Sequence, residues 1–114
     1  MVVETYSEEK LIAGEYGTDN RYLLASGEGV IKDGRLLKLD GGKLKKCNAG
    51  EEPHSVFKAR EQGGIVDATS SDVPIAYITH GELYEEGIDF GDGTPDEFVE
   101  KLRVLGIYIR KTNK

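Results

Sequence analysis

The chain has 114 residues, the usual size of one domain with one modest hydrophobic core. Its 21 acidic against 15 basic residues give a formal net charge of -6, which disfavours a nucleic-acid partner, since such a surface needs clustered Lys and Arg. The only cysteine excludes an intrachain disulfide, and the absence of an apolar leader or long apolar run predicts a soluble protein made without signal-peptide export and with no membrane partner.

Residues 1–10 are mainly polar and acidic, and no helical periodicity links their few apolar side chains. We predict that they form a flexible N-terminal arm with strand-like character from Val2 to Tyr6. Residues 11–114 are then expected to form a single β-rich domain.

Glycines divide residues 11–46 into short apolar runs that are too brief for helices and typical of strands. Two of the divisions contain Asp-Gly, at Asp33-Gly34 and at Asp40-Gly41. Asp-Gly tolerates the positive φ angles of tight hairpin turns, so we expect two chain reversals here.

The middle of the chain, residues 48–62, reads as a polar connection with one apolar pair, Val56 and Phe57. Cys47, just before it, has no nucleophile motif around it. We interpret this cysteine as structural, although neighbouring lysines would lower its pKa.

The segment after this connection predicts strands at Ile65–Ala68 and at Val73–Ile78. Pro74 cannot donate a ladder hydrogen bond, so it belongs at a strand start or on an edge. We expect His80-Gly81-Glu82 to form a turn into a further strand at Leu83-Tyr84.

Near the C-terminus the pattern changes to helical spacing. Phe98, Leu102 and Leu105 recur at i, i+4 and i+7 and predict a short helix over about residues 95–105. Gly106 then suits a left-handed C′ position, and Ile107–Arg110 reads as a final strand.

The stretch GDGTPDEF, residues 91–98, has the residue types of a helix start. Thr94 is a good N-cap, Pro95 suits the first helical position and Asp96 complements the helix dipole. Glu97 is placed to complete a capping box with Thr94.

The acids of this stretch also raise the question of a metal or catalytic site. Asp89, Asp92, Asp96 and Glu97 miss the alternating register of a calcium-binding loop, and no Cys or His lies at zinc-finger spacing from His54 or His80. We therefore expect no catalytic, cofactor-binding or metal site and no cofactor.

Residues 65–110 resemble the C-terminal part of the lambda-like bacteriophage head decoration, or capsid-stabilising, proteins. The residues that carry the resemblance are Gly64-Ile65-Val66, Val73 to Ile78, Gly81-Glu82-Leu83-Tyr84 and Pro95 to Ile109, with the ending Gly106-Ile107-Tyr108-Ile109-Arg110. More loosely, Leu24 to Gly27 and Ile31 to Leu37 are similar to the glycine-bent β structure of the same family.

The resemblance implies an α+β, mostly β domain of the β-clip type that assembles as a homotrimer. Such trimers bind the major capsid protein at local three-fold positions on the outside of the expanded head, so the implied location is the virion. The arm residues expected to contact the capsid are Val2, Val3, Thr5, Tyr6 and Leu11.

Two other functions remain open from the sequence. One is a homotrimeric β-clip enzyme or small-ligand-binding module, for which only fragments of a phosphate-handling loop such as Asp33-Gly34-Arg35 are present. The other is a surface adhesin that binds a cell-surface glycan.

Overall fold

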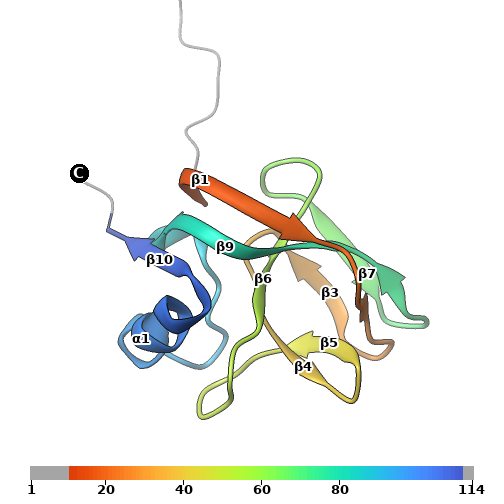
Figure 1. Ribbon diagram of the computed structural model, residues 1–114. Coiled ribbons are helices and arrows are strands. Elements are labelled where there is room, and N and C mark those ends of the chain that lie inside the picture. Colours follow the sequence, from red (N-terminus) through yellow and green to blue (C-terminus); the bar gives the residue numbers. More distant parts are fainter. Residues whose placement is uncertain (1–10, 112–114) are drawn as a thin grey trace, which may run out of the picture.

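The computed structural model describes residues 11–111, in which short strands dominate and one α-helix lies near the C-terminal end (Figure 1). The strands are β1 (Ile12–Asp19), β2 (Leu23–Leu24), β3 (Gly29–Lys32), β4 (Leu36–Asp40), β5 (Lys43–Lys46), β6 (Ser55–Lys58), β7 (Ile65–Ala68), β8 (Val73–Pro74), β9 (Ala76–Tyr84) and β10 (Ile107–Arg110). A 3-10 turn, η1 (Glu85–Gly87), follows β9, and the helix is α1 (Pro95–Leu105). The predicted α+β, mostly β class is confirmed.

The larger sheet curls back on itself. Its strand order is β1-β9-β6-β4-β5-β2-β8, with β10 also paired to β9. Strand β8 is the last in this order and β9 is the second, and only Ile75 separates them along the chain. Strands β3 and β7 form a separate antiparallel pair.

Each face of the large sheet covers its own core. One core lies under α1 and contains Leu36, Val56, Ile78, Phe98 and Leu102; the other lies inside the curl and contains Leu37, Phe57, Tyr77, Leu24 and Leu44. Successive residues of a strand point to opposite faces. Each of three adjacent pairs therefore supplies one side chain to each core: Leu36-Leu37, Val56-Phe57 and Tyr77-Ile78. At these positions the strands have two successive apolar residues in place of an apolar-polar alternation, because both of their faces are buried there.

The expectation of a polar connection over residues 48–62 is wrong at its centre. Residues Ser55–Lys58 form β6, which lies between β4 and β9. The strand is too short to show alternation, and charged residues flank it on both sides. Val56 and Phe57 suffice to make it a central strand, because they fill the two cores.

The turn expected at His80-Gly81-Glu82 is also wrong, because β9 runs without interruption through these residues. Gly81 has φ +135° and lies against β1, where a Cβ atom would be 2.5 Å from Tyr16 Cα and 2.6 Å from Glu15 O. The register of the β1–β9 pair shifts next to this contact. The glycine allows close approach of two backbones within a sheet and does not reverse the chain.

One of the two Asp-Gly reversals is a hairpin. Asp40 pairs with Lys43 across the β4–β5 turn, and Gly41 and Gly42 have φ of +63° and +81°. At the other reversal, Asp33-Gly34, the Arg35 N–H donates to Lys32 O at 3.0 Å. The flanking strands do not form a hairpin, because β3 pairs with β7 and not with β4. That turn carries the chain from the small sheet to the large one.

The strands expected in the C-terminal half of the chain form, with one difference in bounds. Strands β7 and β10 have the expected bounds. The strand expected at Val73–Ile78 is split at Ile75, and Pro74 lies in β8 at the end of the sheet order, which confirms its edge position.

Replacing Gly81 with alanine tests the close approach of β1 and β9. Positive φ costs about 1–2 kcal/mol for an L-residue, and overpacking against Tyr16 adds about 1–3 kcal/mol. We expect Gly81→Ala to lower the free energy of unfolding by about 3 kcal/mol or more in urea titrations. Gly27→Ala is the control, since Gly27 has φ +88° and open space around its Cβ position, and it should show the backbone cost alone. Equal losses in the two variants would contradict the packing argument.

Candidate functional site

The loop before α1 ends in the predicted N-cap. Thr94 has extended φ and ψ angles, its Oγ1 accepts a hydrogen bond from the Glu97 N–H at 3.3 Å, and Pro95 is the first helical residue. At the other end Gly106 has φ +97° and its N–H donates to Arg103 O at 3.0 Å. The cap and the C′ glycine are therefore confirmed.

Glu97 does not complete the capping box. Its Oε2 accepts a hydrogen bond from the Gly50 N–H at 2.5 Å, and so joins the helix to a loop 47 residues earlier. The expected bond back to Thr94 is wrong because a distant backbone donor takes this carboxylate. The residue spacing at the helix start could not predict the Gly50 N–H as the donor, because Gly50 is distant in sequence.

Two aspartates near the helix start also accept backbone N–H groups. Asp89 Oδ1 accepts from Gly91 at 2.9 Å, closing a local turn, and Asp92 Oδ1 accepts from Ala49 at 2.8 Å. Together with Glu97, Asp92 fixes the Ala49–Gly50 segment against the helix start. These carboxylates hold two loops together.

Arg35 is the buried centre of the same region, with 6% of its surface exposed. Its Nη1 donates to Cys47 O at 2.9 Å and to Asp89 O at 3.2 Å, and its Nη2 donates to Asn48 Oδ1 at 2.8 Å. A buried guanidinium requires such acceptors, because unmade hydrogen bonds to a charged group are costly. The sequence offered Arg35 only as a fragment of a phosphate loop, and its inward orientation follows from partners far along the chain.

The loop after β5 has further anchors. The Glu51 side chain accepts from Lys38 Nζ at 2.5 Å and from the Asn48 N–H at 2.8 Å, and both bonds, that of Lys38 first, lower the pKa of the Glu51 carboxyl. Lys101 on α1 donates to Glu51 O at 3.3 Å. The loop thus contacts both the sheet and the helix.

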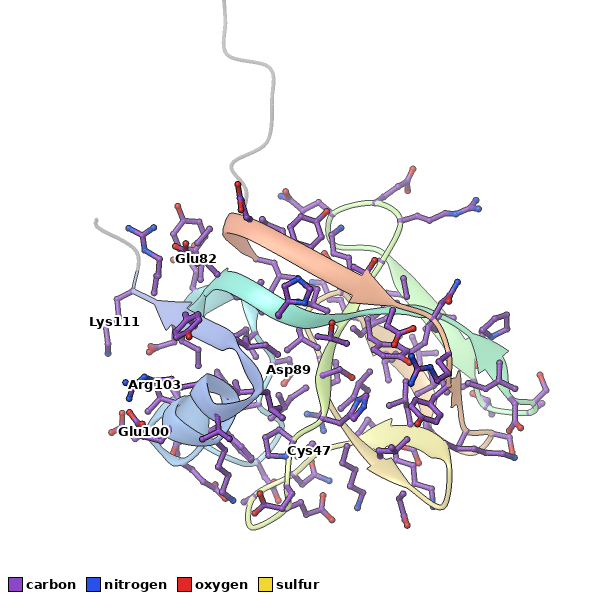
Figure 2. The ribbon with its side chains drawn as sticks, in the orientation of Figure 1. Cys47, Glu82, Asp89, Glu100, Arg103 and Lys111 are labelled. Carbon is purple, nitrogen blue, oxygen red and sulfur yellow. The ribbon has the colours of Figure 1, made fainter. Side chains whose placement is uncertain are left out.

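Cys47 is fully buried in the core under α1. Burial raises the pKa of its thiol to about 11, against the smaller opposing effect of nearby cations that include Arg35. The thiol stays protonated at neutral pH, which agrees with a structural role. Figure 2 labels Cys47 inside the molecule, whereas Asp89 is exposed and Glu100 and Arg103 extend from the outer side of α1.

The two histidines lie in different surroundings. His54 is partly buried, with its ring centroid 5.8 Å from that of Tyr22 and 5.6 Å from that of Tyr77, and its Nδ1 is 3.0 Å from Ser55 Oγ. His80 lies on β9. Within residues 11–111, no group of three or more His, Cys, Asp or Glu side chains is arranged to hold a metal ion.

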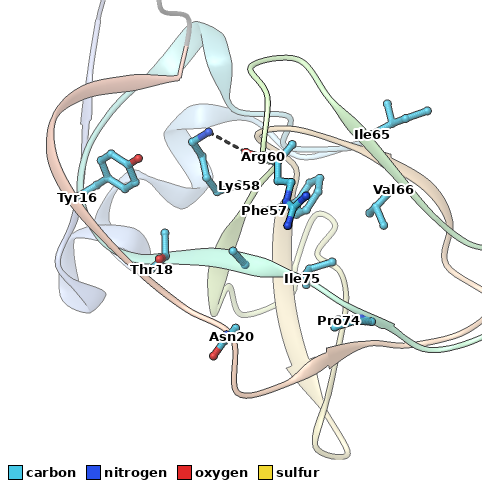
Figure 3. Close-up of a pocket in the computed structure, with 12 residues that line it drawn as sticks. Tyr16, Thr18, Asn20, Phe57, Lys58, Arg60, Ile65, Val66, Pro74 and Ile75 are labelled. Atoms are coloured by element: carbon cyan, nitrogen blue, oxygen red, sulfur yellow. Dashed lines mark hydrogen bonds between the residues drawn. The ribbon is translucent and has the colours of Figure 1, made fainter.

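The surface carries a groove of about 650 Å³ between β1 and β7, here called the β1–β7 groove (Figure 3). Its lining residues are Tyr16, Thr18, Asn20, Phe57, Lys58, Ala59, Arg60, Ile65, Val66, Pro74, Ile75 and Ala76. The walls are mainly apolar, and Ile65 is 65% exposed. Across the described part of the chain, neither Lys58 nor Arg60 forms an ion pair.

A smaller hollow of about 290 Å³ adjoins the groove at Tyr16 and lies over β9 and β10. Tyr16 and Tyr108 are both about half exposed beside it. Val104 and Leu105, at the end of α1, add two more exposed apolar side chains near Gly106. Exposed apolar residues therefore gather around β1, the end of α1 and β10.

Of the five expected capsid-contacting residues, only Leu11 lies among the residues that the structure describes. Val2, Val3, Thr5 and Tyr6 lie outside the described residues. Leu11 is 2% exposed in the core under α1, and its carbonyl accepts from the Tyr84 N–H at 2.8 Å. The assignment of Leu11 to a free arm is therefore wrong, because this residue is already buried in the folded core next to the start of β1.

The cap can be tested by substitution at Thr94. Thr94→Ala removes the acceptor for the Glu97 N–H, and we expect a loss of about 1 kcal/mol in the free energy of unfolding. Thr94→Ser retains the oxygen and should stay within about 0.5 kcal/mol of wild type in the same urea titration. A serine variant as unstable as the alanine variant would argue against the hydrogen bond.

His54 predicts a pH dependence of stability. Burial lowers the pKa of its imidazole below 6.5, so the folded protein favours the neutral ring. Below about pH 6.5 the unfolded chain binds the proton more readily, and stability should fall as the pH is lowered through that value towards the folded-state pKa.

Urea unfolding at pH 7.5, 6.5 and 5.5 measures this effect. We expect a smaller loss of stability on acidification in His54→Asn than in wild type. His80→Asn is the control, because it removes an imidazole and leaves His54 in place. An unchanged pH dependence in His54→Asn would refute the assignment.

Within residues 11–111 no helix is long and apolar enough to cross a membrane. No protein-family model matches the chain, and searches of curated proteins and of solved structures found no match. The resemblance to head decoration proteins therefore rests on the sequence features described above.

Proposed function

We propose that this chain is a non-enzymatic bacteriophage head decoration protein. In this proposal it binds as a homotrimer at local three-fold positions on the outside of the expanded head, contacts the major capsid protein and stabilises the shell. The observation that carries the proposal is the position of β1, the edge strand that directly follows the arm of residues 1–10.

Strand β1 pairs with β9 on one side, and the part of the chain that the structure describes provides no strand for its other side. An unpaired strand edge presents backbone N–H and C=O groups, and an extended segment can bind it through main-chain hydrogen bonds. Strand β1 begins at Ile12, so in this proposal the strand-pairing edge follows directly after the residues that contact the capsid.

Leu11 limits the proposed arm. Because this residue is buried and its carbonyl is bonded to Tyr84, the capsid contact is assigned to Val2, Val3, Thr5 and Tyr6 alone. Leu11 then acts as the anchor from which the arm starts.

Stabilisation follows from mass action. A protein that binds the assembled lattice and not its dissociated subunits raises the free energy needed to open the shell by an amount set by its occupancy. A trimer that engages the lattice through several arms gains further from high effective concentration after the first contact. The net charge of -6 suits an outer surface that does not touch the packaged DNA.

Co-sedimentation with expanded heads of the protein's own phage tests the proposal. We expect saturable binding of the full chain and weaker binding to unexpanded heads. A Val2→Asp, Val3→Asp double variant should bind about tenfold or more weakly, because it loses two apolar contacts. Val30→Asp is the matched control, since Val30 is an exposed valine on β3, outside the arm. Failure of the wild-type chain to sediment with expanded heads would refute the proposed function.

A further inference from the structure

The β1–β7 groove combines apolar walls with two cations that have no carboxylate partner in residues 11–111. Lys58 Nζ donates only to Ala59 O, at 2.9 Å, and Arg60 is exposed. Ile65 and Ile75 line the same groove. A complementary surface would place acids beside an apolar side chain.

Helix α1 presents such a surface on its solvent side. Its buried side consists of Phe98 and Leu102, and the exposed Asp96, Glu100 and Val104 recur every four residues, so they share one face. We call these three residues the outer helix stripe.

The outer helix stripe has no covering partner within the described chain. Val104 is 86% exposed, the largest exposure among the large hydrophobic residues described. Glu100 pairs only with Arg103, at 3.1 Å, and both side chains are more than half exposed. Such surface pairs contribute little, so Glu100 is available to another cation.

The stripe and the groove lie on different sides of the molecule. Figure 1 shows α1 beside β10 on one side and β7 on the other, with the large sheet between them. A chain cannot place its own α1 in its own groove without unfolding the sheet. Contact between the two surfaces therefore requires a second copy.

We propose that the outer helix stripe of one copy docks in the β1–β7 groove of a second copy, and that this contact forms the seam of the homotrimer. Asp96 and Glu100 face Lys58 and Arg60, and Val104 packs on the apolar wall. The contact joins two different surfaces, so repetition generates a ring when the rotation closes. The inference rests on the homotrimer of the proposed function.

Sedimentation equilibrium of the purified full chain tests the seam through a charge exchange. We expect Arg60→Glu and Glu100→Arg each to raise the dissociation constant of the trimer by about tenfold or more, and the double variant to recover most of the loss. Lys45→Glu is the control, because Lys45 pairs with Asp40 on the β4–β5 hairpin, away from both surfaces, and it should leave the trimer intact.

A substitution at Val104 tests the apolar part of the seam. Val104→Asp should dissociate the trimer, and Val30→Asp, which changes an exposed valine that does not line the groove, should not. Thermal unfolding of each variant checks that the fold is retained. A folded Val104→Asp or Arg60→Glu that remains trimeric, or a wild-type chain that is monomeric at all concentrations, would overturn the inference.

Head binding separates the two proposals. If the seam variants stay trimeric while wild type still sediments with heads, the seam is wrong and the decoration function stands. If the charge exchange restores trimers but wild type does not bind heads, the seam stands and the proposed function fails.

Discussion

The pairing of β9 with three other strands is the interaction on which the rest of the structure depends. On one side β9 pairs with β1 along most of its length, and on the other it pairs first with β6 and then with β10. Its side chains also serve both cores, since Tyr77 lies inside the curl and Ile78 lies under α1. Gly81 allows the backbones of β1 and β9 to approach closely within this arrangement.

The buried guanidinium of Arg35 imposes a second constraint, at the place where the sheet meets the helix. Its three acceptors come from the loop after β5 and from the segment before α1, which are distant in sequence. Asp92 and Glu97 add bonds between the same two segments. Hydrogen bonds to charged groups contribute about 1.5–3 kcal/mol each, so this set orients α1 strongly against the sheet.

Asp89, Asp92 and Glu97 thus make hydrogen bonds within the chain, whereas Asp96 is exposed on the outer side of α1. Around the outside of the fold lie the edge of β1 that faces away from β9, which no strand of residues 11–111 covers, the β1–β7 groove and the outer helix stripe. The groove has core residues such as Phe57 and Ile75 at its floor, whereas the outer helix stripe belongs to neither core. In the proposed function the β1 edge lies beside the arm that contacts the capsid, and the groove and stripe join copies to one another.

Features set by neighbours within a few residues could be predicted from the sequence. The Thr94 cap, the α1 bounds, the Gly106 C′ position and the β4–β5 hairpin all depend on local backbone geometry and on hydrogen bonds that span one turn. Their residue types are selected by those local requirements. These local requirements by themselves identify the acidic stretch as a helix start.

Features that depend on distant partners were decided only by the tertiary structure. Strand β6 has only two apolar residues between charged segments, and its central position follows from the burial of these residues in two different cores. Gly81 resembles a turn residue because glycine occurs both in chain reversals and where two backbones approach closely. The inward position of Arg35 and the bond from Gly50 to Glu97 join segments that only folding brings together. Sequence alone therefore determined where the helix and the hairpin begin and end, and long-range pairing decided which strands are central and which surfaces remain exposed.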